Sequence, residues 1–201
     1  MNINLEDAGM RKRFEGLTAS QVSDVMDRFG VLDSAVRPVW HGASFVGRAV
    51  TVMTAAGDNK VIHDVIPTLQ DGDVLVVNGQ GYTNRALIGE LMAERGQRRG
   101  CVAYVIDGAV RDVDEIAALQ FPVYARGATP AGPYRNGPGT VGVPVAVGGV
   151  VVSPGDWIIG DSDGVAVVPQ NDLEEVLTRA EKKRDQELQQ QSDIRAGLVD
   201  V

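Results

Sequence analysis

An adjacent arginine and aspartate, Arg111 and Asp112, are the residues whose types and spacing most clearly allow chemistry. They follow an apolar run over 102–106, which predicts a strand that delivers both side chains to its C-terminal edge. Ligands bind at that edge in open α/β sheets. A guanidinium and a carboxylate there could hold a divalent metal ion and an anionic oxygen together. The alternative is structural: Asp112 could be the N-cap of a helix over 113–119, with Glu115 completing a capping box.

A second candidate lies at the predicted helix over 89–99, which begins with Gly89, Glu90, Leu91 and Met92. Free backbone N–H groups at a helix N-terminus can bind a carboxylate or phosphate, and glycine lets the ligand approach closely. Twenty residues separate Glu90 from Arg111. Two parallel strands joined by one helix would place them at the same sheet edge. Glu90 could equally be a first-turn acid that complements the helix dipole.

Other chemistries lack the residues they need. His41 and His63 are the only histidines, and neither has a partner at the spacing of zinc ligands. No serine stands in a nucleophile elbow, and no lysine is an obvious Schiff-base former. The glycines of 79–84 imitate a dinucleotide-binding loop, but Asn84 stands where the third glycine is required. Carboxylates and arginine remain, which is oxygen-ligand chemistry suited to Mg²⁺ or Mn²⁺.

Composition limits the class of protein. With 201 residues, 44% of them hydrophobic, the chain is expected to form one globular domain over 1–201. The net charge of −8 disfavours nucleic acid as a partner, because phosphates would be repelled. No apolar stretch is long enough to cross a membrane, so the cytoplasm is the expected location. Cys101 begins an apolar strand, which predicts a buried thiol.

The surrounding pattern predicts an α/β fold with a mixed sheet. A capping box at Thr18 opens a helix whose apolar positions continue to Phe29 and end at Gly30. Strands and helices then alternate, which favours parallel pairing, and a glycine- and valine-rich part predicts hairpins. These expected elements are strands 44–54, 74–77, 101–106 and 122–125, helices 60–69, 89–99 and 113–119, hairpins over 141–168, a last helix over 172–191 and a frayed tail at 197–201.

These motifs resemble the RraA-like family, which includes the class II 4-hydroxy-4-methyl-2-oxoglutarate / 4-carboxy-4-hydroxy-2-oxoadipate aldolases. The most specific element is an acid, twenty residues, and then Arg-Asp, matched here by Glu90, Arg111 and Asp112. Many members have Asp at the first of these positions. The similarity covers nearly the whole chain, through the segments 72–77, 89–91, 108–115, 121–127, 137–139, 144–145, 148–150, 154–156 and 161–165.

The resemblance implies a swivelling β/β/α fold with a projecting C-terminal helix, assembled as a homotrimer or a hexamer with active sites between subunits. It implies a metal-dependent aldolase that cleaves a 4-hydroxy-2-oxo acid to pyruvate, with oxaloacetate decarboxylation as a side activity. Asp112 would bind Mg²⁺ or Mn²⁺, and Arg111 would hold the keto oxygen. The amides of 89–92 would hold the carboxylate, and Glu90 would hold a water. A glutamate of the neighbour's last helix would complete the site, Glu187 by spacing, with Glu181 as the second choice.

The same family offers a different function. Some members bind and inhibit an RNA-degrading endonuclease, and such members can lack the acid that follows the arginine, whereas Asp112 is present here. A methyltransferase function has no support, because no convincing cofactor-binding glycine loop is present. The substrate beyond its pyruvyl unit would meet the loop 126–140. There Arg126, Tyr134 and Arg135 could bind a second carboxylate, or could be surface or subunit contacts.

Overall fold

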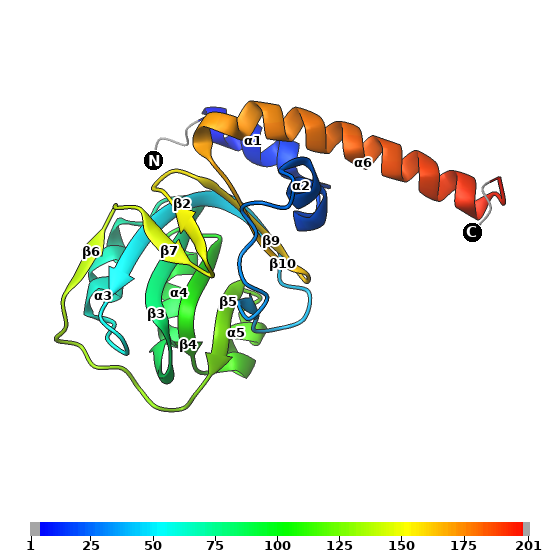
Figure 1. Cartoon of the computed structure of the whole chain (residues 1–201). Coiled ribbons are helices and arrows are strands. Elements are labelled where there is room, and N and C mark those ends of the chain that lie inside the picture. The colour runs from blue at the N-terminus through cyan, green and yellow to red at the C-terminus, as the bar shows by residue number, and fades with distance from the viewer. Residues whose placement is uncertain (1–4, 199–201) are drawn as a thin grey trace.

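The computed structural model describes residues 5–198, and Figure 1 shows a single body of sheet and helices from which one long helix projects. The central sheet is mixed, with the order β1-β5-β4-β3-β2-β9-β10. Its parallel strands are β2 (Phe45–Thr54), β3 (Asp73–Ile88), β4 (Ala103–Val110) and β5 (Val123–Ala128). The predicted mixed α/β domain is confirmed.

Antiparallel strands extend and cover this parallel core. At one edge β1 (Arg37–Pro38) pairs with β5, and at the other the hairpin of β9 (Trp157–Asp161) and β10 (Gly164–Val168) joins β2. The far end of β2 pairs with β6 (Gly139–Val141). The strands β7 (Val145–Val147) and β8 (Val150–Val152) form a separate hairpin. The predicted hairpins in the later part of the chain are therefore confirmed.

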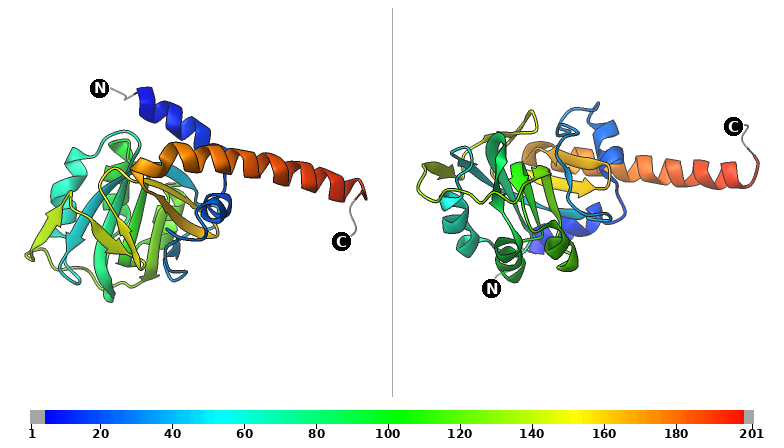
Figure 2. Two further views of the ribbon diagram at one scale, coloured as in Figure 1. Left: turned by 45° about the horizontal axis from the view of Figure 1, so that its top comes forward. Right: turned by 90° about the horizontal axis from the view of Figure 1, so that it is seen from below.

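The first part of β3, residues 74–77, is a continuous apolar run, as expected for a parallel strand whose two faces are both covered. Leu75 and Val77 of β3 pack in one core cluster with α3 (Lys60–Val65), α4 (Glu90–Arg98) and α5 (Val113–Ala118). Val74 and Val76 point the other way and pack with β7, β8 and the β9–β10 hairpin. Figures 1 and 2 show the sheet between these two layers.

Three elements end differently from the sequence prediction. The helix capped by Thr18 is α2 (Ala19–Val25), and its capping box is present. It stops before Phe29, because Asp27 and Arg28 adopt left-handed backbone conformations, and Phe29 is 78% exposed. Strand β4 continues past residue 106 to Val110. Strand β3 likewise runs through the glycines of 79–81 to Ile88 with bulges, so these glycines do not lead into a helix as a dinucleotide loop would.

The last helix, α6 (Leu173–Arg195), is longer than predicted. Its first half is buried through Leu173, Val176, Leu177 and Ala180, whereas its second half leaves the body of the molecule (Figures 1 and 2). Helix α1 (Leu5–Phe14) and α2 pack beside its first half. The N–H groups of Gly197 and Leu198 donate to the last turn of α6, and residues 199–201 lie outside the described part, so the frayed tail over 197–201 stays a prediction.

Two further observations concern the core and the surface. Cys101 is 3% exposed, as predicted, and burial raises the pKa of its thiol to about 12. Within residues 5–198, no helix has the length and apolar character needed to cross a bilayer.

Candidate active site

The Arg111–Asp112 pair lies where β4 ends and α5 begins, at the carboxyl edge of the parallel strands. The Arg111 N–H donates to the Ile88 carbonyl over 3.0 Å, which joins the ends of β4 and β3. Because β3 leads directly into α4, this contact brings the start of α4 beside the pair. The structure therefore places Gly89, Glu90 and Leu91 next to Arg111 and Asp112, as the twenty-residue spacing predicted.

Asp112 is held in an unusual conformation. Its backbone is left-handed, with φ 57° and ψ 45°, and its side chain makes no capping bond to α5, so the capping-box alternative is wrong. Instead Asp112 Oδ2 accepts the Glu90 N–H over 3.2 Å and lies 3.5 Å from Arg111 Nε. Left-handed backbone at a residue other than glycine costs about 1–2 kcal/mol and concentrates at functional sites.

Gly89 permits this approach through its lack of a side chain. Its φ of −148° is extended and open to any residue. A Cβ at this position would collide with Asp112 Oδ2 and would lie 3.0 Å from Arg111 Cγ. The glycine therefore makes room for the carboxylate rather than for a special backbone conformation.

Some of the backbone N–H groups at the start of α4 already donate to acceptors within the chain. The Glu90 N–H donates to Asp112 and the Met92 N–H donates to the Gly89 carbonyl. Within residues 5–198, the Leu91 N–H has no acceptor, as expected for the first turn of a helix. The Leu91 side chain is 71% exposed. The Leu91 N–H is thus available to an anion that binds at this turn.

A cavity of about 280 Å³ opens beside this arrangement. Its walls come from α3, the end of β3, the start of α4, the Arg111–Asp112 turn and the loop after β5. The lining side chains include Asn59, His63, Leu91, Arg95, Arg111, Asp112 and Arg135. Four of these are cationic or can become so, and one is an anion, so the cavity suits a negatively charged ligand with a metal ion at its Asp112 end.

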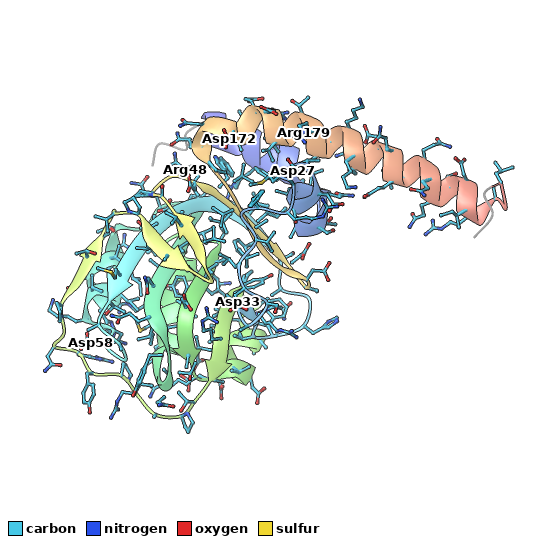
Figure 3. The ribbon with its side chains drawn as sticks, viewed as in Figure 1. Asp27, Asp33, Arg48, Asp58, Asp172 and Arg179 are labelled. Atoms are coloured by element: carbon cyan, nitrogen blue, oxygen red, sulfur yellow. The ribbon has the colours of Figure 1, made fainter. Side chains whose placement is uncertain are left out.

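Asp58 fixes the loop that forms one wall. This carboxylate is 3% exposed and accepts the backbone N–H groups of Lys60, Asn136 and Gly137 over 2.8–2.9 Å. Burial alone would raise the pKa of Asp58, but these bonds to the charged form lower it overall. In Figure 3 Asp58 lies at the end of the molecule away from α6. The sequence analysis missed this residue, because an Asp-Asn pair before a helix looks like an ordinary turn.

His63, set aside in the sequence analysis because it has no zinc-ligand partner, lines the same cavity. Arg95 Nη1 lies 3.1 Å from His63 Nδ1. Burial lowers the pKa of His63, and the charges of Arg135 and Arg95 lower it further. Since guanidinium can only donate, Nδ1 accepts and the proton of the neutral ring is on Nε2. His63 is therefore a neutral side chain with an N–H donor.

The donor set fits a magnesium or manganese ion held by few protein atoms. Among the described residues, no three histidine, cysteine or acidic side chains gather as a metal cage. Asp112 is one carboxylate, 38% exposed, in a water-accessible cavity. Mg²⁺ usually keeps several waters and binds proteins through one or two carboxylates. An ion at Asp112 with water as its other ligands is consistent with that preference.

The remaining predicted residues lie apart from this cavity within one chain. Glu187 is on the projecting half of α6, where it accepts from Gln21 and pairs with Lys183, and both contacts lower its pKa. Glu181 is paired with Arg13 of α1 over 2.9 Å, which lowers the pKa of Glu181. One subunit thus does not bring either glutamate to Asp112.

Arg126 and Tyr134 also have partners within the chain. Arg126 pairs with the buried Asp107 and with Asp33, so it joins β5 to β4 and to the 26–36 segment. Tyr134 stacks under Arg85, whose guanidinium lies 4.1 Å from the ring centre. Of the three loop residues proposed from sequence for a second carboxylate, only Arg135 lines the cavity.

Comparisons with known proteins agree with this geometry. The family model described as Aldolase/RraA matches residues 19–167. A protein of Halalkalibacterium halodurans named "Putative 4-hydroxy-4-methyl-2-oxoglutarate aldolase" is 37% identical over 172 residues, which cover 86% of this chain and 82% of the relative.

Solved structures share the fold. A protein of Pseudomonas syringae pv. tomato superimposes with a TM-score of 0.85 at 26% identity, covering 94% of both chains. The RNA-processing inhibitor RraA from Thermus thermophilis has a TM-score of 0.69 at 32% identity, covering 75% of this chain and 92% of its own. The range matched by the family model, 19–167, includes every residue that lines the cavity.

Proposed function

The chain belongs to the Aldolase/RraA family, and we propose that it is a metal-dependent lyase that cleaves a 4-hydroxy-2-oxo acid to form pyruvate. The observation that carries this proposal is the Asp112 carboxylate, held in a left-handed turn against the Glu90 amide and beside Arg111. The similarity to a relative named as an aldolase supports the reaction class.

The residues of the chain have separate tasks in this reaction. Of the amides of 89–92, the Leu91 N–H, which has no acceptor within the described residues, binds the carboxylate of the pyruvyl unit. Arg111 donates to the keto oxygen, which becomes negatively charged as the C3–C4 bond breaks and the electron pair moves into the enolate. The proton of the 4-hydroxyl group leaves to a water positioned by Glu90, C4 leaves as a carbonyl product, and the enolate takes a proton back from water at C3 to give pyruvate. Loss of CO₂ from oxaloacetate produces the same enolate, so decarboxylation is the expected side activity.

Asp112, with water, would hold Mg²⁺ or Mn²⁺, and such an ion would supply further positive charge near the keto oxygen. Asp112 is suited to this role because its second carboxylate oxygen is not used in the contact with the Glu90 amide. The Glu90 N–H fixes the carboxylate before the ion arrives, which reduces the cost of ordering it.

The site is completed by a neighbouring subunit in a homotrimer or hexamer. This part of the proposal is supported by the shape of α6, whose polar second half projects from its own body (Figure 1). Leu188 and Ile194 on this half are 58% and 46% exposed. A neighbouring subunit that covers them would receive Glu187 near its own Asp112, where the glutamate would hold the water that accepts the proton.

A regulator is the second candidate, because the chain resembles the RNA-processing inhibitor of Thermus thermophilis. Inhibition by surface binding does not require a strained carboxylate beside an arginine. The two functions are separated by measuring pyruvate release from oxaloacetate and from 4-hydroxy-4-methyl-2-oxoglutarate, with Mg²⁺ and then with excess EDTA. Asp112→Asn should abolish metal-dependent release, whereas Asp114→Asn, on the exposed surface of α5, should not. No pyruvate from either substrate with a folded protein would favour the regulator.

A further inference from the structure

Glu187, which the proposed function brings to a neighbouring subunit, is held by two donors from its own chain. Gln21 Nε2 of α2 donates to Glu187 Oε2 over 2.7 Å, and Lys183 Nζ lies 3.0 Å from Glu187 Oε1. Each oxygen of the carboxylate therefore has its own contact, one from α2 and one from α6. These contacts fix the orientation of the carboxylate although the side chain is 42% exposed.

Both donors are themselves held in place. Lys183 Nζ also pairs with Asp24 Oδ2 of α2 over 2.9 Å, so it connects the two helices. Gln21 Oε1 accepts the Thr18 N–H over 3.1 Å as part of the capping box of α2. Because the side-chain oxygen of Gln21 accepts this bond, its amide nitrogen is the group left to donate to Glu187. Gln21, Asp24 and Lys183 thus form a clamp around Glu187.

The clamp lies at the point where α6 leaves its own subunit. Helix α2 packs against α6, and α6 continues past it into the projecting half (Figure 1). Within the described residues, Glu187 is the last residue of α6 with a side-chain hydrogen bond or ion pair to another element. Beyond it, the side-chain bond from Gln189 to Asp193 stays within the helix.

Glu181, the other glutamate considered for the shared site, has a different environment. Arg13 Nε donates to Glu181 Oε1 over 2.9 Å, and Arg13 Nη2 donates to Oε2 over 3.1 Å. Such a bidentate pair with one guanidinium is the strongest form of ion pair between side chains. Glu181 also lies about 9 Å nearer the start of α6 than Glu187, at 1.5 Å per residue. Glu181 therefore joins α1 to α6, and Glu187 is the glutamate placed for a neighbour.

We propose that Gln21 and Lys183 are positioning residues that orient the Glu187 carboxylate for the active site of the neighbouring subunit. This inference rests on the proposed function, in which Glu187 holds the water that accepts the proton of the 4-hydroxyl group. Ordering a long glutamate side chain costs conformational entropy, and supporting contacts that order it in advance reduce that cost during the reaction. Exposed ion pairs contribute little to stability, so variants of the clamp should remain folded.

The first test compares two reactions that depend differently on Glu187. Cleavage of 4-hydroxy-4-methyl-2-oxoglutarate requires loss of the hydroxyl proton, whereas oxaloacetate loses CO₂ without this step. Gln21→Glu keeps an acceptor for the capping box but places a carboxylate opposite Glu187, and Lys183→Gln removes the cation. Each variant should lower kcat for cleavage by about tenfold or more and leave kcat for decarboxylation within about twofold, because loss of a residue that orients a site ligand typically costs about 10–100-fold.

Two control variants accompany this comparison. Lys183→Arg keeps a cation that can pair with Asp24 and Glu187, so it should retain cleavage activity. Lys182→Gln makes the same exchange of residue type at the preceding, exposed position and should change neither reaction. Equal loss of both reactions in the clamp variants, or undiminished cleavage, overturns the proposal.

Mixed subunits test which chain the clamp serves. Asp112→Asn subunits supply an intact Glu187, and Glu187→Gln subunits supply an intact Asp112. Adding Lys183→Gln to the first kind of subunit should reduce the cleavage activity that mixing restores, whereas adding it to the second kind should not. A loss in both placements, or in neither, overturns the proposal.

A crystal structure of the assembled protein with Mn²⁺ requires no turnover and separates failure of the clamp from failure of the proposed function. If Glu187 lies at Asp112 of a neighbouring subunit and keeps its contacts with Gln21 and Lys183, the positioning role is supported even when neither substrate is cleaved, and only the lyase function is wrong. If Glu187 reaches that Asp112 with both contacts broken, the clamp is overturned and the shared site stands. If Glu187 lies away from every neighbouring active site, both are wrong.

Discussion

Replacing Gly89 with alanine tests whether the position of the Asp112 carboxylate determines activity. The added Cβ would collide with Asp112 Oδ2 and lie 3.0 Å from Arg111 Cγ, so both side chains must move. Restoring ordinary contact distances requires a shift of the carboxylate of about 1 Å. A misplacement of that size costs about 10²-fold in rate. We expect kcat/KM for pyruvate formation to fall by about 10²-fold.

The stability of the same variant should change much less. Moving Asp112 weakens its hydrogen bond to the Glu90 N–H, which for this partly exposed group costs about 1 kcal/mol. The φ of Gly89 is compatible with alanine, which stabilises by about 0.4–1 kcal/mol through the unfolded chain. The two effects nearly cancel. The free energy of unfolding should therefore stay within about 1 kcal/mol of wild type, so lost activity cannot be attributed to unfolding.

The assay is steady-state pyruvate release with saturating Mg²⁺, paired with urea denaturation of the same samples. Gly127→Ala is the control, because a Cβ at Gly127 of β5 meets nothing within 4 Å and needs no positive φ. This control should retain wild-type activity. If Gly89→Ala keeps more than half of the wild-type kcat/KM, or loses activity only in proportion to its unfolded fraction, the proposed importance of the carboxylate position is refuted.

Four further predictions follow from the same contacts. Arg111→Lys keeps the charge but loses the planar donors, so kcat should fall by roughly 10²-fold, and a change in KM alone would contradict the role at the enolate oxygen. Asp58→Asn should lower the free energy of unfolding in urea by about 1.5–3 kcal/mol at pH 7, because at least one hydrogen bond from a backbone N–H to this side chain must be lost. Since folding lowers the pKa of Asp58, the difference in stability between wild type and variant should vanish as the pH falls below 3.8. A difference that persists at such a pH would contradict this account of Asp58. Cys101 should resist alkylation by iodoacetamide at pH 8 in the folded protein and react in urea, because burial keeps its thiol protonated, and equal rates in both states would be inconsistent with this. Mixing Asp112→Asn subunits with Glu187→Gln subunits should restore activity through interfaces that contain one intact site, and an inactive mixture of normally assembled variants would exclude shared sites.

Sequence patterns predicted those features of the fold that depend on residues close together in the chain. The Thr18 capping box, the Asp112 position after a strand and the regular alternation of strands and helices depend on contacts between residues near each other in sequence. The ends of β3 and β4 could not be predicted in this way. The last residues of β3 are strand because they pair with β4 through bulges, as at Ala86 and Ala109, and the last residues of β4 also pair with β5. Pairing between distant segments overrides local turn propensity.

The candidate site likewise has residues that could be predicted from the sequence and residues that could not. Residue types and the twenty-residue spacing were enough to predict that Glu90, Arg111 and Asp112 lie together, because that spacing is the length of one helix and one strand between two points of the same sheet edge. The cavity wall of Asn59, His63, Arg95 and Arg135 has no such signature, since its members come from separate elements and meet only when the loop after β5 folds back onto α3. Sequence by itself therefore determined which chemically suitable side chains lie at one sheet edge, while the tertiary structure decided what surrounds them, because the contacts that close the cavity are between residues far apart in the chain.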